Sequence, residues 1–240
     1  HKGSDAMSIK DNILEIEAQI ENACKRVGRS KDEVQLIAVT KLHTPAEINE
    51  ALDAGITDIA ENKVQEILNK YEAVGEARWH LIGHLQTNKV KYIVDKVVMI
   101  HSVDSLKLAK EIDKRSSAIG RTMDILIQVN SAEEESKFGI KSTEVDSLIY
   151  DIVNECKSVR IKGLMCIAPF EEDVNDCRPY FAEVKEIFDR YKGDEREAVD
   201  FEFLSMGMSG DFEVAIEEGS NMVRVGTAIF GVRNYRQEEK

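Results

Sequence analysis

The feature that most constrains the fold is an unbroken alternation of short apolar segments with amphipathic helical ones. Eight strands are expected, at residues 35–40, 57–60, 80–83, 97–101, 124–130, 160–167, 201–205 and 222–225. One helix is expected before the first strand, at 8–27, and others after each strand, at about 44–55, 63–73, 88–94, 104–119, 142–155, 174–191, 211–219 and 227–230. Several strands are continuous apolar runs, which is typical of strands covered on both faces.

This alternation predicts parallel pairing, because each helix returns the chain to the starting edge of the sheet. Eight repeats predict a closed (β/α)8 barrel, with the first helix as an addition. The alternative is an open doubly wound sheet, which usually has fewer strands and often a glycine-rich first turn. The first turn here, residues 41–44, contains no glycine. We therefore expect a single α/β barrel domain over residues 7–240, and we interpret residues 1–6 as an expression-tag remnant.

Charge and composition narrow the functional class. The chain has 240 residues, with 32 basic and 45 acidic side chains, and its formal net charge is −13. That excess argues against non-specific nucleic-acid binding and against binding to anionic membrane surfaces, since both need Lys and Arg. No apolar run is long enough for a membrane span. The four cysteines lack disulfide or zinc-site spacing, so we expect no metal and a cytoplasmic location.

In such a barrel the reactive groups gather at the carboxyl ends of the strands. The last two strands end in sequences that suit a phosphate. Ser209-Gly210-Asp211 precedes a helix, where Ser209 is placed to cap the helix and backbone amides can face an anion. Gly226-Thr227 lets the backbone approach a phosphate and adds a hydroxyl. Each motif alone is common, but both occur where phosphate sites recur in barrels.

Two basic residues end strands with side chains expected to face the barrel mouth. Lys41 ends the first strand, where an ammonium needs a partner or a depressed pKa; a neutral lysine amine forms Schiff bases with carbonyls. A lysine that reaches solvent from the strand end is the structural alternative. Arg224 alternates with Val223 and Val225 and is expected to point inward. A buried guanidinium needs a partner, and an ion pair with Glu61 is the structural alternative there.

Other strand ends carry weaker signals. Asn62 is either a ligand-facing amide or a helix cap, and His84 and His101 are more commonly structural at such positions. The methionines of residues 205–209 are expected to pack, although Met208 directly precedes Ser209. An inward lysine with a phosphate pocket fits either a Schiff-base aldolase acting on a phosphorylated sugar or a site for pyridoxal 5′-phosphate (PLP), which carries both an aldehyde and a phosphate. Composition and spacing do not separate these two.

A series of sequence blocks is specific enough to indicate a family. They are AVTK at 38–41 with PAEI at 45–48, ENKVQE at 61–66, WHLIGHLQTNK at 79–89, SKFG at 136–139, GLM at 163–165 with IAP at 167–169, LSMGMS at 204–209, and RVGTAIFG at 224–231. In this order they resemble the PLP homeostasis protein family. The resemblance covers the chain from the first helix to Gly231.

The resemblance implies a fold-type III PLP barrel, related to the barrel domain of alanine racemase. It implies that Lys41 holds PLP as a Schiff base, that Arg224 faces the pyridine nitrogen, and that the two last strand ends hold the phosphate. The implied cofactor-binding residues are Lys41, Asn62, His84, Met208, Ser209, Arg224, Gly226 and Thr227. No catalytic residue is assigned.

An arginine at the ring nitrogen favours a carrier over an enzyme. Arginine does not readily give up a proton, so the ring nitrogen stays unprotonated and PLP is a weaker electron sink. The expected function is intracellular PLP homeostasis, with possible delivery of PLP to apo-enzymes and without strong catalysis. The alternative is a PLP-dependent amino-acid racemase of narrow scope, which would need a second base, usually from an added C-terminal domain. We expect a monomer rather than an obligate dimer.

Overall fold

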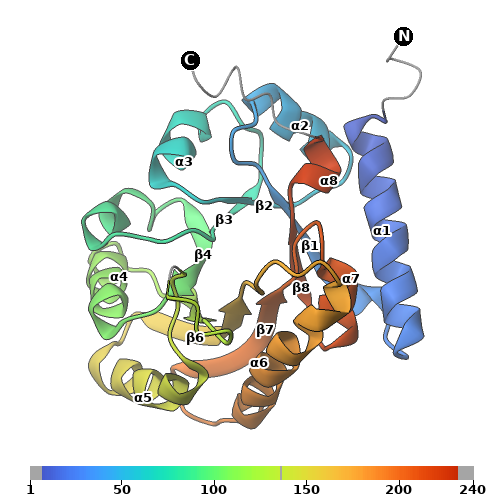
Figure 1. Cartoon of the computed structure of the whole chain (residues 1–240). Coiled ribbons are helices and arrows are strands. Elements are labelled where there is room, and N and C mark those ends of the chain that lie inside the picture. The colour runs from blue at the N-terminus through green and yellow to red at the C-terminus, as the bar shows by residue number, and fades with distance from the viewer. Residues whose placement is uncertain (1–6, 136, 232–240) are drawn as a thin grey trace.

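The barrel predicted from the sequence is confirmed. A computed structural model describes residues 7–135 and 137–231, so the expected tag remnant lies outside the described residues. Eight parallel strands close into a barrel in chain order, and the last pairs with the first (Figure 1). The strands are β1 Gln35–Val39, β2 Asp58–Glu61, β3 Arg78–Leu81, β4 Val97–Val103, β5 Met123–Val129, β6 Val159–Cys166, β7 Val199–Met206 and β8 Met222–Val225.

The α-helices surround this barrel (Figure 1). They are α1 Ile9–Arg26, α2 Pro45–Asp53, α3 Val64–Lys70, α4 Leu106–Ala118, α5 Val145–Glu155, α6 Arg178–Tyr191, α7 Phe212–Glu217 and α8 Thr227–Phe230. Short 3₁₀ helices lie at η1 Lys31–Glu33, η2 Thr87–Tyr92, η3 Ser142–Glu144 and η4 Val174–Cys177. Within the described ranges, none of these helices has the length and hydropathy that a membrane crossing requires.

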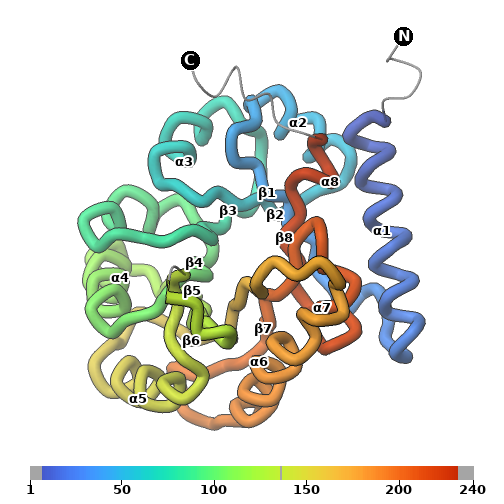
Figure 2. The backbone as a smooth tube through the Cα atoms, in the orientation of Figure 1, coloured from blue at the N-terminus to red at the C-terminus, as the bar shows by residue number. Residues whose placement is uncertain are grey.

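The added helix α1 packs where the last strand of the barrel meets the first. It lies outside the ring of helices and runs alongside α7 and α8 (Figure 2). Its apolar stripe, Ile13, Ile16 and Ile20, is buried, as the three- and four-residue spacing predicts. At its end Arg26 pairs with Glu213 at 2.9 Å and with Glu217 at 2.5 Å. The helix therefore covers the seam at which β8 closes onto β1.

Two apolar cores result from the alternation of side chains along the strands. The barrel interior is filled by Ile37, Ala60, Met99, Leu126, Met165 and Met222. The larger core lies between the strands and the helices and includes Ile59, Ile112 and Phe181. Gly163 lets β6 and β7 approach each other, because its φ is +150° and a Cβ there would lie 1.7 Å from the Phe203 carbonyl oxygen. Because the interior is filled by side chains, a ligand would have to bind at the ends of the strands.

Several local predictions need correction. The helix predicted at 88–94 is the 3₁₀ helix η2, and the strand predicted at 80–83 begins two residues earlier, as β3. The helices predicted at 142–155 and 174–191 each begin with a 3₁₀ turn. The helix predicted at 104–119 begins at Leu106, as α4, and its N-cap is Ser105, whose hydroxyl accepts from the Leu108 amide at 3.1 Å. Asp104 lies before the helix, and its carboxylate accepts from the Gly139 amide at 3.1 Å.

Candidate functional site

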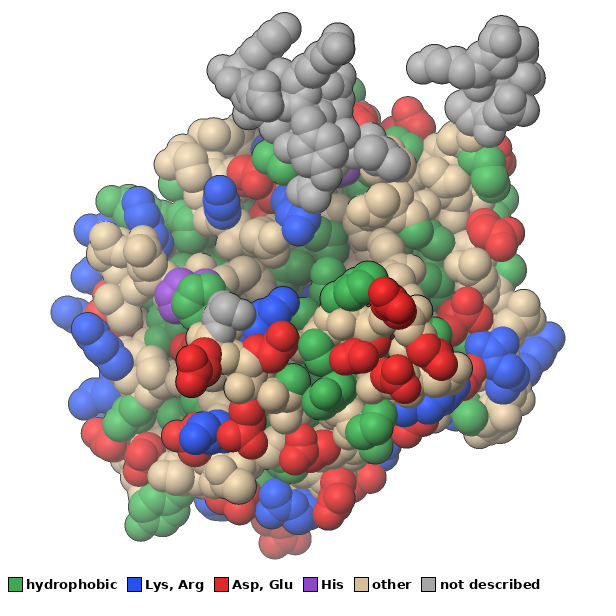
Figure 3. Space-filling model, in the orientation of Figure 1, with side chains coloured by type: hydrophobic (Ala, Val, Ile, Leu, Met, Phe, Trp, Pro, Cys, Tyr) green, Lys and Arg blue, Asp and Glu red, His purple; other side chains and the backbone are tan. Residues whose placement is uncertain are grey.

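The carboxyl ends of β1, β7 and β8 border one cavity of about 260 Å³. Six of the eight residues predicted from the sequence line it, namely Lys41, Met208, Ser209, Arg224, Gly226 and Thr227. Figure 3 looks onto this face of the molecule, which is hollowed near its centre. The fold therefore brings Lys41 and Arg224 to one cavity with the loops after β7 and β8, which we call the phosphate-type loops because their sequences suit a phosphate.

The residue before Lys41 is held by a buried ion pair. The Thr40 hydroxyl donates to Glu61 Oε2 at 2.6 Å, and Lys70 Nζ, from α3, donates to the same oxygen at 2.8 Å. Lys70 Nζ also donates to the Thr40 carbonyl oxygen at 2.9 Å. Glu61 is fully buried. These contacts join the end of β1 to β2 and α3, directly behind Lys41.

The residue after Lys41 is held by the same helix. Leu42 has a φ of +65°, a conformation that costs a side-chain-bearing residue roughly 1–3 kcal/mol and persists only when neighbouring contacts enforce it. Its amide donates to Glu66 Oε1 at 2.8 Å, and Glu66 pairs with Lys70 at 2.8 Å. Both sides of Lys41 are therefore fixed by α3, and the lysine stands on a constrained turn.

The ion pair between Arg224 and Glu61, which was the structural alternative predicted for Arg224, does not form. Glu61 alternates with Ala60, which fills the barrel interior, so the Glu61 side chain faces outward to α3 and pairs with Lys70. Burial raises the pKa of Glu61, and Lys70 and Thr40 oppose that rise. The second carboxylate oxygen, Oε1, is buried without a hydrogen-bond partner among the described residues. Lys70 is thus the charge that makes this buried carboxylate tolerable.

Arg224 is a buried cation at the floor of the cavity. Its side chain is 2% exposed. Nη1 donates to the Ser205 hydroxyl, and Nη2 donates to the Cys166 carbonyl oxygen at 3.0 Å. Burial lowers the pKa of Arg224 from its usual value. Because a guanidinium has five N–H donors, these two contacts fix its plane and leave donors for a ligand in the cavity.

The phosphate-type loops meet beside α8. Ser209 Oγ accepts from the Ala228 amide at 3.2 Å, which links the loop after β7 to the start of α8. Gly226 passes close to β1, since a Cβ there would lie 3.2 Å from the Val39 carbonyl oxygen. The Thr227 amide is in the first helical turn, where backbone N–H groups have no acceptor within their own helix. The loops supply hydroxyls and amides suited to an anion.

The predicted capping role of Ser209 is wrong. The N-cap of α7 is Asp211, and Ser209 bonds to α8 instead. Asp211 turns back on its own loop, where Oδ1 accepts from the Met208 amide at 2.7 Å. Burial raises the pKa of Asp211, against the effect of this hydrogen bond. The carboxylate therefore shapes the loop that carries Ser209.

The other two predicted residues, Asn62 and His84, line a second cavity of about 430 Å³ on the same face. This cavity lies between the loops after β2 and β3. The His84 ring stacks on Phe138 with centroids 3.9 Å apart. Just before His84, Gly83 packs so tightly that a Cβ would lie 2.2 Å from the Asn62 carbonyl oxygen. The structure does not bring these two residues into the Lys41 cavity, and their contact with a ligand stays a prediction.

Three residues that line the Lys41 cavity were not among the predicted ones, namely Val39, His43 and Gly210, and His43 is the one with an aromatic ring. Its ring stacks on Phe230 with centroids 4.4 Å apart, and Nδ1 lies 3.3 Å from Glu47 Oε2. The available signal was its place two residues after Lys41 in the first turn. His43 forms the wall that connects the lysine turn to α8.

Comparisons with known proteins agree on one family. The family model for the alanine racemase N-terminal domain matches residues 12–234. A pyridoxal phosphate homeostasis protein of Aquifex aeolicus is 42% identical over 231 residues, which cover 95% of this chain and 100% of that protein. The homologue of the same name in Escherichia coli K12 is 36% identical over 236 residues, covering 96% and 99%.

A solved structure extends the comparison. PipY of Synechococcus elongatus, with PLP bound, is 31% identical and has a TM-score of 0.78; the match covers 93% of this chain and 100% of that one. The likeness in sequence and in fold thus extends over nearly the whole of both chains. On these grounds the chain belongs to the pyridoxal phosphate homeostasis protein family, which shares the alanine racemase N-terminal domain.

Proposed function

We propose that this chain binds PLP in the Lys41 cavity, holds it as a Schiff base on Lys41, and serves intracellular PLP homeostasis. The observation that carries the proposal is the meeting of Lys41, Arg224, Ser209 and Thr227 around one cavity of about 260 Å³. PLP binding is supported by the names of the relatives and by the PLP-bound PipY structure.

The residues present fit the chemical groups of PLP. A lysine amine matches the aldehyde, the hydroxyls and amides near Ser209 and Thr227 match the phosphate, and the guanidinium of Arg224 matches an acceptor nitrogen on the ring. When bound, PLP supplies an electrophilic aldehyde. Lys41, as a neutral amine, would hold the group through that aldehyde. The constrained turn at Leu42 keeps Nζ at the cavity.

The same residues favour holding PLP over reacting it. Arg224 is a permanent donor, and a ring nitrogen that accepts its hydrogen bond stays unprotonated. Carbanion chemistry gains little from such a ring. We therefore propose a carrier that limits the concentration of the free aldehyde and releases it to apo-enzymes, when an incoming amine or water reverses the bond at Lys41. We propose that a single chain suffices for this role.

Reductive trapping tests the proposal. The protein is mixed with PLP, its visible absorption spectrum is recorded before and after borohydride reduction, and the reduced adduct is located by peptide mass mapping. We expect a visible band and one adduct on Lys41. The Lys41→Ala variant is expected to lose both, while Lys63→Ala, at a lysine of the second cavity, is expected to keep them.

Three outcomes would contradict the proposal. Absence of the band, or adducts scattered over surface lysines, would make the Schiff-base aldolase the better hypothesis; borohydride would then trap a phosphorylated sugar on Lys41. Loss of optical rotation with members of an amino-acid panel would establish a racemase in place of a carrier.

A further inference from the structure

A row of buried polar side chains crosses the barrel interior behind the Lys41 cavity. Arg224 Nη1 donates to the Ser205 hydroxyl. Ser205 Oγ lies 3.1 Å from His101 Nδ1, and His101 Nε2 lies 2.9 Å from His80 Nδ1. His80 Nε2 lies 2.7 Å from Asp58 Oδ2. All five side chains are at most 2% exposed. The contacts form one continuous hydrogen-bonded row from β8 to β2.

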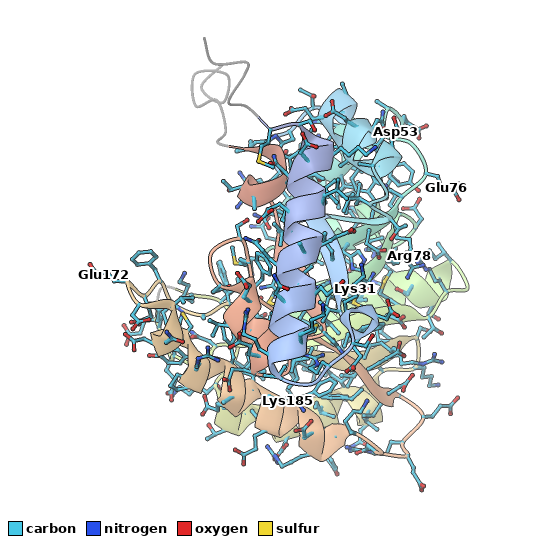
Figure 4. All side chains as sticks on the ribbon, turned by 90° about the vertical axis from the view of Figure 1, so that its right-hand side faces the viewer. Lys31, Asp53, Glu76, Arg78, Glu172 and Lys185 are labelled. Carbon is cyan, nitrogen blue, oxygen red and sulfur yellow. The ribbon has the colours of Figure 1, made fainter. Side chains whose placement is uncertain are left out.

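The row reaches from the cavity to the opposite end of the barrel. Asp58 is the first residue of β2, and its Oδ2 lies 3.3 Å from Nε of Arg78, the first residue of β3. The Arg78 side chain is 62% exposed. Figure 4 shows Arg78 and Glu172 at opposite ends of the molecule, and Glu172 follows β6 on the face that holds the Lys41 cavity. The row therefore spans the barrel interior.

The two ends of the row are compatible with one continuous direction of donation. A guanidinium only donates, so the Ser205 oxygen accepts from Arg224 and its own proton is free to be donated. Donation to His101 Nδ1 requires that nitrogen to be unprotonated, which places the ring proton on Nε2. That proton then bonds to His80 Nδ1, and His80 in turn donates from Nε2 to the Asp58 carboxylate. In this arrangement every bond points the same way, from the cation to the anion.

The charges agree with this direction. Within the described residues, Arg224 bonds to a hydroxyl and a carbonyl and to no carboxylate. Asp211 acts on Arg224 through space, but its carboxylate bonds to the Met208 amide. Burial holds the pKa of His101 well below its usual range. Burial would raise the pKa of Asp58, but hydrogen bonds from His80 and other neighbours bring it below its usual value.

We propose that Asp58, His80, His101 and Ser205 form a relay that positions Arg224 toward the ring nitrogen of the cofactor and supplies its counter-charge from the far end of the barrel. This inference rests on the proposed function, because the relay positions Arg224 toward a cofactor whose binding here is itself proposed. The four are positioning residues, since the described contacts place none of them against the cavity. Their effect on the ligand passes through the guanidinium, whose plane Ser205 and the Cys166 carbonyl hold.

The first experiment determines which ring nitrogens of the relay histidines carry protons, in the absence of any cofactor. Long-range ¹⁵N–¹H NMR of the histidine rings in the PLP-free protein reports which ring nitrogen carries the proton. For His101 we expect the neutral form, protonated on Nε2, from pH 5 to pH 9, and for His80 an Nδ1 that carries no proton and accepts from it. In Ser205→Ala we expect His101 to lose this fixed form, because its Nδ1 no longer accepts from a hydroxyl. The readout is independent of PLP, so a failed relay and a failed proposed function are separate results.

The second experiment measures how the relay affects the affinity for PLP and its visible absorption band. For Ser205→Ala we expect PLP to bind about tenfold more weakly and its visible band to shift, since a hydrogen bond to a charged group is lost. Asp58→Asn keeps an acceptor oxygen for His80 and removes the charge, so we expect a smaller loss, about threefold. Asp124→Asn is the matched control, because Asp124 is a half-buried carboxylate at the start of β5 outside the relay. We expect it to bind PLP as the wild type does.

Two results overturn the proposal. One is a wild-type His101 whose proton resides on Nδ1, or a His80 whose Nδ1 carries a proton, because the row would then point toward Ser205 from both ends. The other is unchanged PLP affinity and an unchanged spectrum in both folded variants, Ser205→Ala and Asp58→Asn. If Ser205→Ala does not fold, the wild-type histidine spectra and Asp58→Asn decide the question.

Discussion

Replacing Lys70 by methionine isolates the ion pair that holds the Lys41 turn. Lys70 Nζ donates to Glu61 Oε2 at 2.8 Å and to the Thr40 carbonyl oxygen at 2.9 Å. The side chains of Lys70 and Glu61 are 10% and 0% exposed. Methionine has a similar length and no charge. Lys70→Met therefore leaves a fully buried carboxylate whose remaining hydrogen bond comes from the Thr40 hydroxyl.

The expected loss of stability at pH 8 is large. Removing one partner of a buried ion pair costs about 3–5 kcal/mol in the free energy of unfolding. For a chain of this size each kcal/mol lowers Tm by about 2–4 °C, so Tm should fall by about 6–20 °C. The double variant Glu61→Gln/Lys70→Met carries no buried charge and should recover most of this loss.

The loss should also depend on pH in a defined direction. Burial already raises the pKa of Glu61, and removal of Lys70 raises it further. Between the unfolded and folded pKa values the native state binds a proton that the unfolded state lacks, so stability falls as pH rises, by about 1.4 kcal/mol per pH unit. The difference between Lys70→Met and wild type should therefore be smaller at pH 5 than at pH 8.

Urea denaturation at both pH values measures these quantities. Lys63→Met, at an exposed lysine just before the same helix, is the matched control and should stay within about 0.5 kcal/mol of wild type. A Lys70→Met protein that loses less than about 1 kcal/mol at pH 8 would show that Glu61 and Lys70 do not form a buried ion pair in solution, since breaking such a pair must cost more. A loss of equal size at pH 5 and pH 8 would refute the role given to Glu61.

Three further results are expected. Gly83→Ala should destabilise the protein by about 1–3 kcal/mol in urea denaturation, because its Cβ would lie 2.2 Å from the Asn62 carbonyl oxygen; Gly210→Ala, with open space around it, is the control, and equal effects would contradict this. Burial raises the pKa of the Cys166 thiol to about 12, so thiol reagents at pH 8 should modify it only after unfolding; rapid labelling of the native protein would be inconsistent with this burial. Thr227→Ala should weaken PLP binding at least about tenfold, measured by absorbance titration, if its hydroxyl bonds to the phosphate, and unchanged affinity would remove Thr227 from the site.

The barrel was predictable because its signal is repeated along the whole chain. Each strand–helix unit carries its own periodicity, and the residue ranges of β8 and α8 agree with the prediction. The start of α2 also follows a sequence rule: Thr44 and Glu47 have the spacing of a capping box and form one in the structure. The prediction was least accurate at residues 80–94. The segment after β3 is a 3₁₀ helix, which the period of 3.6 residues does not describe.

The Lys41 cavity was largely predictable for a different reason. The carboxyl ends of parallel strands must meet on one face, so residues at those ends were the natural candidates. What the sequence did not show is which ends share a cavity. Asn62 and His84 follow β2 and β3, and the packing of their loops gives them a cavity of their own. Lys70 was missed because the predicted helix at 63–73 did not reveal which of its side chains faces the Lys41 turn.

The buried row behind Arg224 could not be predicted from strand alternation. Its members come from five strands, and contact between them depends on the stagger of each strand against the next. The register of β4 shifts between Ile100 and Val103, at the position of His101. Bulges of this kind redirect a side chain without a sequence signal that alternation can detect. Distances across the barrel therefore needed the structure.

A crystal structure of the protein with PLP is the sharpest test of the proposed site. We predict electron density continuous from Lys41 Nζ into the cofactor, with the phosphate beside Ser209 and Thr227 and the ring nitrogen toward Arg224. Cofactor density in the second cavity, or a ring whose nitrogen faces away from Arg224, would contradict it.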